Sequence, residues 1–179
     1  MKQELTCFKT YDIRGELGKN FSEEICFQIG KAFSSFFGAK KIVVGHDSRS
    51  SSPSLASSLK KGIISQGSDV LDIGLAGTEE VYWATTRFGA CGGIEVTASH
   101  NPSNYNGLKL VKSGSVPLSP IDELSALFSF CLTGQATAVL TISNDTVSYM
   151  GGARSELDFK GLIDSLIIIS HSLKPLSKL

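Results

Sequence analysis

The sequence predicts an α/β fold: a three-layer α/β/α domain with a mixed, mostly parallel sheet, followed by an incomplete second domain. Two observations carry this prediction. Short β-branched segments alternate with segments whose apolar residues recur at helical spacing, which is typical of a sheet covered by helices. The chain has 179 residues, more than one ordinary domain needs. We therefore expect a complete domain over residues 1–150 and the beginning of another over residues 151–179.

The first part of the domain should contain two helices with a strand between them. Ser22 and two glutamates open an apolar-periodic run that Gly38 ends, which predicts a helix. Residues 41–45 form a buried β-branched segment typical of a strand, and a polar loop follows it. Pro53 fits the first turn of a second helix that closes near Gly67. The apolar face of this helix is expected to hold Leu55, Leu59, Ile63 and Ile64.

The alternation continues toward the end of the domain. Residues 69–74 and 92–97 are expected strands, and residues 78–88 are an expected helix between them. Residues 104–107 have turn chemistry, and residues 108–112 alternate apolar and cationic side chains, as a strand with two different faces does. The close spacing of the last two strands predicts an antiparallel pair.

The remainder of the chain gives a weaker pattern. Helices are expected over residues 121–130 and 157–169. The low-charge stretch at residues 133–148 favours no single structure. Because nothing after Lys174 completes a second core, we interpret the last helix as the opening of a further domain.

Charge and cysteine content limit the partners and the location. The 17 basic residues balance 17 acidic ones, so nothing attracts the chain generally to nucleic acid or to an anionic membrane. The first four residues lack the apolar core of a signal peptide, and the densest apolar run, residues 166–169, is far shorter than the roughly 20 residues that span a bilayer. Four scattered cysteines fit reduced thiols better than disulfides or zinc. We expect a cytoplasmic protein, with its oligomeric state left open.

The segment with the most chemical information is residues 92–102, Gly-Gly-Ile-Glu-Val-Thr-Ala-Ser-His-Asn-Pro. A buried strand delivers Ser99 into a tight polar turn beside His100, which is how a nucleophile or phosphate carrier is presented. The segment is not the G-x-S-x-G turn of an α/β-hydrolase, and no carboxylate is evident as a triad member, so acyl transfer is disfavoured. The alternative is a plain Asn-Pro turn in which Ser99 bonds to the backbone, and a Ser-His pair alone would favour it.

Three cations close to loop-forming segments favour an anionic substrate. Lys109 lies on the following strand, Arg14 lies in Tyr-Asp-Ile-Arg-Gly, and Arg49 ends Gly-His-Asp-Ser-Arg. Taken singly, each fits a solvated surface charge. Together they suit a phosphate, because lysine supplies a compact charge and arginine supplies forked donors.

These segments, in this order and at this spacing, resemble the α-D-phosphohexomutases, most closely their phosphomannomutase/phosphoglucomutase branch. The resemblance runs from about Phe8 to Ser119, and the Thr-Ala-Ser-His-Asn-Pro string is its most specific part. The segments that carry it are residues 8–15, 43–49, 77–80, 93–102 and 105–111.

The resemblance implies that Ser99 is the family's phosphoserine. In such an enzyme this residue donates its phosphoryl group to a hexose monophosphate and takes one back from hexose 1,6-bisphosphate, the intermediate and activator. The net reaction interconverts hexose 6-phosphate and hexose 1-phosphate in carbohydrate metabolism. The resemblance also implies Mg²⁺, bound through a phosphoryl oxygen on Ser99. Such an ion suits phosphoryl transfer, which depends on positioning and on neutralising charge.

Other residues match the family at single positions. Lys109 and Arg14 match residues proposed to assist proton transfer and to stabilise the moving phosphate. His100 matches the histidine beside the phosphoserine, and we count it with them as a catalytic residue. The residues expected to bind the substrate are Tyr11, Arg49 and Asn101.

The chain also departs from the family's pattern. Family members have four domains, of which this chain contains the first and the beginning of the second. It lacks the Asp-x-Asp-x-Asp metal loop of the second domain and the sugar and phosphate loops of the third and fourth. Two hypotheses follow: an N-terminal part of a phosphohexomutase that is inactive alone, or a truncated non-catalytic fragment or weak phosphate-binding module. Choice among mannose, glucose and glucosamine would depend on the third domain, although residues 95–97 and 77–80 favour the phosphomannomutase branch.

Overall fold

The centre of the domain is a six-stranded sheet in the order β1-β5-β4-β2-β3, with β6 paired to β5. The computed structural model describes residues 6–119, 123–133, 139–143 and 146–150. The strands of the sheet are Ile13–Glu16 (β1), Lys41–His46 (β2), Asp69–Leu75 (β3), Gly92–Val96 (β4), Tyr105–Lys112 (β5) and Val116–Pro117 (β6).

The sheet is mixed, and one strand opposes all the others in it. β2 pairs in parallel with β3 and β4, whereas β5 pairs antiparallel with β4, β1 and β6. The direct loop from β4 to β5 explains this reversal, because antiparallel neighbours can be joined by a short loop while parallel neighbours need a crossover. The predicted mixed, mostly parallel sheet is confirmed.

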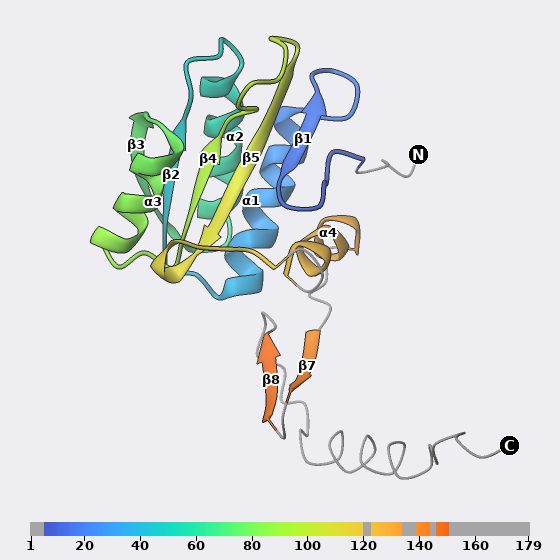
Figure 1. Cartoon of the computed structure of the whole chain (residues 1–179), viewed down its shortest axis with the longest axis vertical. Coiled ribbons are helices and arrows are strands. Elements are labelled where there is room, and N and C mark those ends of the chain that lie inside the picture. The colour runs from blue at the N-terminus through green and yellow to red at the C-terminus, as the bar shows by residue number, and fades with distance from the viewer. Residues whose placement is uncertain (1–5, 120–122, 134–138, 144–145, 151–179) are drawn as a thin grey trace, which may run out of the picture.

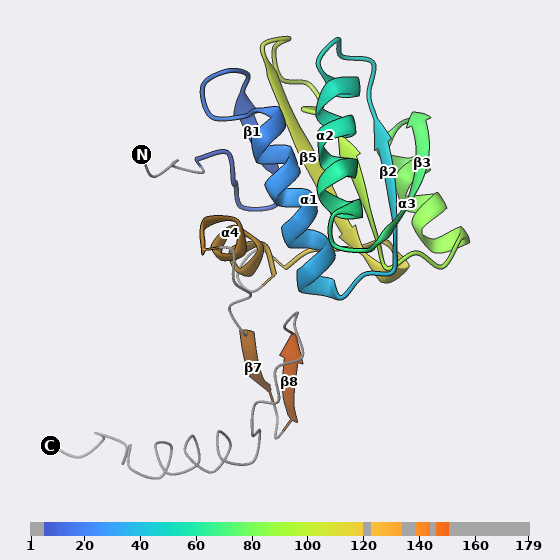
Figure 2. The same cartoon turned by 180° about the vertical axis from the view of Figure 1, so that it is seen from behind.

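Helices cover both faces of this sheet, which confirms the three-layer prediction (Figures 1 and 2). α1 (Glu23–Phe37) and α2 (Ser52–Ile64) lie on one face, and α3 (Thr78–Arg87) lies on the other. The chain passes outward from β2 to β3 through α2 and returns over β2 to β4 through α3. Because both crossovers are expected to be right-handed, the change of direction places these two helices on opposite faces.

The first helix begins and ends where its sequence signals predict. The Ser22 hydroxyl accepts a hydrogen bond from the Ile25 N–H at 3.4 Å, and Gly38 closes the helix with φ 53°. A left-handed residue at this position is nearly free of strain only for glycine. α4 (Glu123–Thr133) then packs against α1 from further along the chain.

α1 and α2 approach each other closely because each has a glycine at the contact. A Cβ atom at Gly30 would lie 2.3 Å from the carbonyl oxygen of Leu59, and one at Gly62 would lie 2.1 Å from that of Phe27. Backbone atoms cannot give way as a flexible side chain can, so any larger residue would push the helices apart.

Alternation along β2 separates two apolar clusters. Ile42 and Val44 belong to the large cluster under α1 and α2, whereas Val43 belongs to a small cluster with Val81 and Ala84 of α3. The large cluster includes Phe33 and many other fully buried side chains. The hydrophobic core therefore lies mainly on the α1/α2 face.

Three features near the sheet and beyond it differ from the sequence prediction. β5 begins at Tyr105, so residues 105–107 are strand residues instead of a turn, because they pair with β1. Ile64, expected on the apolar face of α2, is 57% exposed at the last residue of that helix. Part of the unassigned stretch is an antiparallel hairpin of β7 (Val139–Ser143) and β8 (Thr146–Met150).

The predicted helix over residues 157–169 lies outside the described residues, and the domain boundary near residue 150 stays a prediction. In the part of the chain that the structure describes, no helix combines the length and the apolar character that crossing a membrane requires.

Candidate active site

The candidate site lies at the carboxyl edge of the parallel strands. Val96 at the end of β4 lies beside His46 at the end of β2, and a loop over residues 97–104 then leads into β5. Figures 1 and 2 show this loop next to the one that follows β2. Ligands of open α/β sheets bind at such an edge. We call residues 97–104 the Ser99 loop.

Ser99 stands in this loop in a conformation that serine seldom adopts. Its φ is 54°, in the left-handed region that costs a residue other than glycine energy. The hydroxyl of buried Thr97 holds it there by accepting the Ser99 N–H at 2.9 Å. The Ser99 side chain is exposed, with its Oγ 3.5 Å from His100 Nδ1. The loop therefore presents a hydroxyl group to solvent beside an imidazole.

Arg14 reaches the Ser99 loop from β1. Its guanidinium pairs with the Asp12 carboxylate at 2.8 Å through both Nε and Nη2. The remaining terminal nitrogen, Nη1, donates to Asn101 Oδ1 at 2.9 Å. Asp12 therefore fixes the guanidinium plane, and Asn101 connects it to the loop. This contact brings together residues 87 positions apart in the sequence.

Arg49 contacts the same loop from the end of β2, and its partners there are backbone carbonyls. Nη1 donates to the carbonyl oxygens of Pro102 at 2.8 Å and Tyr105 at 3.2 Å. Nη2 donates to those of Ser99 at 2.9 Å and Asn101 at 2.6 Å. Because each terminal nitrogen has two N–H groups, these four carbonyls use all of them.

Three polar residues support Arg49 and the far end of the loop. Asp47 Oδ2 lies 3.2 Å from Arg49 Nε, and Asp47 Oδ1 accepts the Ser52 hydroxyl. Ser52 in turn accepts Asn106 Nδ2 at 2.9 Å. Ser52 and Asn106 are fully buried. A continuous polar chain therefore runs from Arg49 to the start of α2 and to β5.

Lys109 lies on the α3 face of the sheet, as Arg14 does. Leu108 and Ile13, their neighbours along β5 and β1, belong to the core under α1 and α2, and side chains alternate between faces. Among the described residues, the Lys109 ammonium forms no hydrogen bond and no ion pair. Its cross-strand partner on β4 is Glu95.

Glu95 is a buried carboxylic acid on that face. It is 1% exposed, and its Oε2 has no hydrogen-bond partner among the described residues. The pKa of the Glu95 carboxyl is raised from 4.5 to about 8, mainly by burial and in part by the carboxylates of Asp47 and Glu80, while Lys109 acts in the opposite direction. The group is therefore largely protonated near neutral pH.

Residues 5–129 match the family described as phosphoglucomutase/phosphomannomutase, alpha/beta/alpha domain I. The chain belongs to this family. The match covers the sheet, its helices and the whole Ser99 loop. The resemblance stated from the sequence is thereby confirmed.

Relatives and solved structures agree with the family. A phosphomannomutase from Escherichia coli is 58% identical over 116 residues, which are 65% of this chain and 25% of the relative. One from Klebsiella pneumoniae is also 58% identical over 116 residues, 65% of this chain and 74% of the relative. A phosphoglucomutase/phosphomannomutase family structure from Burkholderia thailandensis has a TM-score of 0.65 at 33% identity, covering 73% of this chain and 31% of the other. The chain thus spans about a quarter of the Escherichia coli relative.

The structure brings most of the predicted site residues of this family member to one place. Arg14 and Arg49 are linked to the Ser99 loop by the hydrogen bonds above, Asn101 lies in that loop, and His100 follows Ser99 directly. Tyr11 is different: it is 78% exposed and forms no hydrogen bond to the loop in the described part of the chain. The structure tests none of the assigned roles, so all of them stay predictions.

The residues present do not make a magnesium site by themselves. Within the described ranges, no group of three or more histidine, cysteine, aspartate or glutamate side chains could hold a metal ion. The carboxylates of Asp12 and Asp47 are paired with arginines, and Glu95 is buried. A cation at Ser99 would therefore need further oxygen ligands.

Four residues that shape the site are absent from the predictions made from the sequence: Thr97, Asp47, Ser52 and Asn106. Thr97 and Asp47 stood inside quoted motifs, so a search for partners of Ser99 and Arg49 at two-residue spacing would have found them. Asn106 lay in a segment expected to be a turn. Its contact to Ser52 spans 54 positions and has no local signal.

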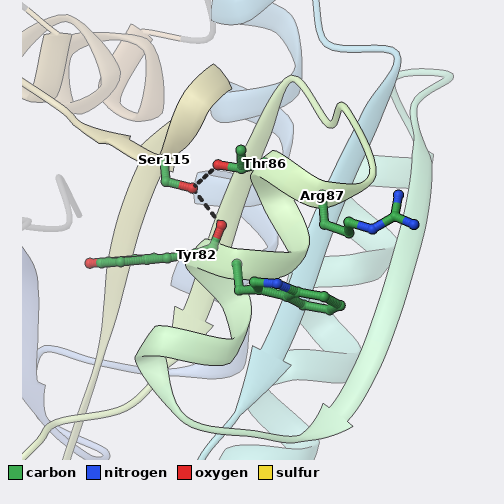
Figure 3. A pocket seen from close by; sticks show the side chains of 5 residues that line it. Tyr82, Thr86, Arg87 and Ser115 are labelled. Carbon is green, nitrogen blue, oxygen red and sulfur yellow. Dashed lines mark hydrogen bonds between the residues drawn. The ribbon is translucent and has the colours of Figure 1, made fainter.

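A hollow lies away from the Ser99 loop, between α3 and the turn after β5 (Figure 3). It encloses about 430 Å³ and is lined by Tyr82, Trp83, Thr86, Arg87 and Ser115. The Ser115 hydroxyl lies 2.8 Å from that of Thr86 and donates to the Tyr82 carbonyl at 2.5 Å. None of the predicted site residues lines it.

Proposed function

We propose that this chain is the N-terminal part of a phosphohexomutase in which Ser99 carries the phosphoryl group that moves between hexose 6-phosphate and hexose 1-phosphate. The observation that carries the proposal is the Ser99 loop, which holds an exposed hydroxyl in a left-handed conformation at the carboxyl edge of the sheet. Family membership and relatives named phosphomannomutase support it.

The charges around the loop fit the chemistry of phosphoryl transfer. In the first transfer the hydroxyl oxygen of the hexose phosphate attacks phosphorus, the bond from phosphorus to the Ser99 oxygen breaks, and the proton of the hexose hydroxyl passes to the Ser99 oxygen. The return transfer makes the reverse changes at the other phosphate of the bisphosphate: the Ser99 oxygen attacks and loses its proton, and the released hexose oxygen gains one. Arg14 would lower the cost of the negative charge on the moving group. Lys109, which has no hydrogen bond or ion pair among the described residues, would assist this proton transfer. His100 would assist at the Ser99 oxygen, 3.5 Å from its ring.

The remaining parts of the proposal rest on the resemblance. Hexose 1,6-bisphosphate would be the intermediate and activator, Tyr11 and Asn101 would lie close to the sugar phosphate, and Mg²⁺ would bind the phosphoryl oxygen on Ser99. We assign the ion no step, because the described residues do not complete its site. A cytoplasmic location is proposed from the four cysteines, all of which are free thiols.

The experiment labels hexose 1,6-bisphosphate in its phosphoryl groups and follows transfer to protein. It uses the polypeptide of the complete reading frame that contains this chain, with Mg²⁺ present. We expect label on Ser99, located by mass spectrometry, and its loss in Ser99→Ala together with mutase turnover. Ser103→Ala, which removes another exposed serine of the same loop, should keep both. Normal turnover of Ser99→Ala would refute the proposal.

A second candidate is a non-catalytic fragment or weak phosphate-binding module. It is favoured by the engagement of both arginines of the site with protein groups and by the lack of a metal cluster among the described residues. In the same labelling experiment, the 179-residue chain alone is expected to take up little label, because nothing holds donor and acceptor in line. Rapid stoichiometric labelling of the chain would exclude this candidate.

A further inference from the structure

We infer that Arg49 is a positioning residue that sets the conformation of the Ser99 loop, instead of a residue that binds the substrate. An effect of Arg49 on catalysis rests on the proposed function of Ser99. Its effect on the conformation of the loop does not, because that effect follows from the contacts of the guanidinium alone.

All N–H donors of the Arg49 guanidinium are in use. Both N–H groups of Nη1 and both of Nη2 donate to backbone carbonyls, and Nε faces the Asp47 carboxylate at 3.2 Å. A phosphate could gain these donors only if the carbonyls lost them, and for the partly buried contacts to Asn101 and Tyr105 that loss is costly. The side chain of Arg49 therefore has little left to offer to a ligand.

The four carbonyls are spread along one short segment of the chain. They belong to Ser99, Asn101, Pro102 and Tyr105, so one planar group fixes the loop from the serine to the start of β5. The Ser99 carbonyl is among them, and Ser99 has the left-handed φ of 54°. Such a conformation persists only where its surroundings determine it.

Arg49 is itself held in place. Asp47 faces its Nε and also accepts the Arg49 backbone N–H at 3.1 Å. Ser52 and Asn106 continue the support into α2 and β5. On the opposite side, Arg14 binds the Asn101 side chain while Arg49 binds the Asn101 backbone. The loop is thus attached at two points to elements of the rigid sheet.

The test measures amide hydrogen exchange in the 179-residue chain and in Arg49→Gln, Arg49→Lys and Arg87→Gln. Lysine keeps the charge but lacks the planar fork, and glutamine lacks both. We expect the amides of residues 98–101 and 103–105 to exchange at least about tenfold faster in both Arg49 variants, with the β2 amides unchanged. Arg87 is exposed on α3, so its replacement should alter neither set. If the glutamine variant does not fold, the lysine variant decides.

Two results would overturn the inference. One is loop exchange at the original rate in the Arg49 variants, or equal acceleration through the whole sheet, which would indicate loss of global stability only. The other is a saturable shift of the Arg49 Nε–H signal in nuclear magnetic resonance spectra as inorganic phosphate is added. We expect no such shift, because the donors are already engaged.

Turnover of the complete polypeptide separates positioning from substrate binding. Arg49→Lys should lower kcat at least about tenfold and leave KM for the hexose phosphate within about twofold. A raised KM with unchanged kcat would contradict the inference. If Ser99 takes up no label but the Arg49 variants still loosen the loop, the proposed function fails and this inference stands. If Ser99 takes up label but the Arg49 variants leave the loop unaltered, the proposed function stands and this inference fails.

Discussion

The two faces of the sheet differ in what covers them and in what they bury. The α1/α2 face buries a large apolar cluster and brings its helices together at Gly30 and Gly62. The α3 face has a small cluster and also carries Arg14, Lys109 and buried Glu95. Burial of apolar area is the main source of stability, whereas buried charge costs free energy. The comparison suggests that one face mainly stabilises the domain and that the other carries side chains proposed to act in catalysis.

The largest effect should come from the core of the α1/α2 face. Phe33 is fully buried there, and Phe33→Ala is expected to lower the free energy of unfolding by about 3–5 kcal/mol. The matched change on the α3 side, Trp83→Ala, removes an aromatic side chain that is 62% exposed and should cost about 1 kcal/mol or less. Urea unfolding measures both. Equal losses would contradict the comparison.

The next effect is a pH dependence from the other face. The pKa of the Glu95 carboxyl is raised from 4.5 to about 8 in the folded state, mainly by burial. Between pH 4.5 and 8 the unfolded chain releases a proton from Glu95 that the folded chain keeps. The stabilising contribution of this group is therefore fully present below about pH 4.5 and is lost as pH rises to about 8. The decline should be on the order of a few kcal/mol.

Glu95→Gln tests this origin of the pH dependence. Glutamine has no proton to lose, so the variant should keep its stability as pH rises from 5 to 8, as measured by urea unfolding at each pH. The control Glu24→Gln removes an exposed carboxylate from α1 and should leave the decline in place. A wild-type chain whose stability does not change over this range would show that Glu95 is charged in the folded state.

A smaller effect should come from the close glycine contact between α1 and α2. Gly62→Ala would place a carbon 2.1 Å from the Phe27 carbonyl oxygen, so the helices must move apart. We expect a loss of about 1–3 kcal/mol, although alanine favours a helix by about 1 kcal/mol. Lys61→Ala, at an exposed position of α2, should be close to neutral in the same thermal or urea unfolding. Stabilisation by Gly62→Ala would contradict close packing of α1 and α2.

The smallest effect concerns the start of α1. Ser22→Ala removes the hydroxyl that accepts the Ile25 N–H at 3.4 Å and should cost about 0.5–1 kcal/mol. Ser54→Ala removes an exposed hydroxyl from the first turn of α2 and serves as the control. Unfolding curves of the two variants that coincide would show that the Ser22 cap contributes nothing.

Local signals were enough for most elements of the fold. Helical spacing before Gly38 and the β-branched residues 41–45 predicted α1 and β2 with boundaries within a residue. Tyr105 and the two residues after it were expected to form a turn, because their composition suits one. They are strand residues because β1 pairs with them, and β1 lies some 90 positions earlier in the chain.

The sequence by itself determined the α/β class, most of the helices and strands, and the Ser99 motif, because helix and strand periods, caps and turns depend on neighbouring residues. Only the tertiary structure decided what Arg49 does. From the motif it was one of three cations expected to bind a phosphate. In the fold its donors meet four backbone carbonyls between residues 99 and 105, about 50 positions away. The acceptors around a guanidinium belong to distant segments that meet at one sheet edge. No local sequence pattern indicates which segments meet there.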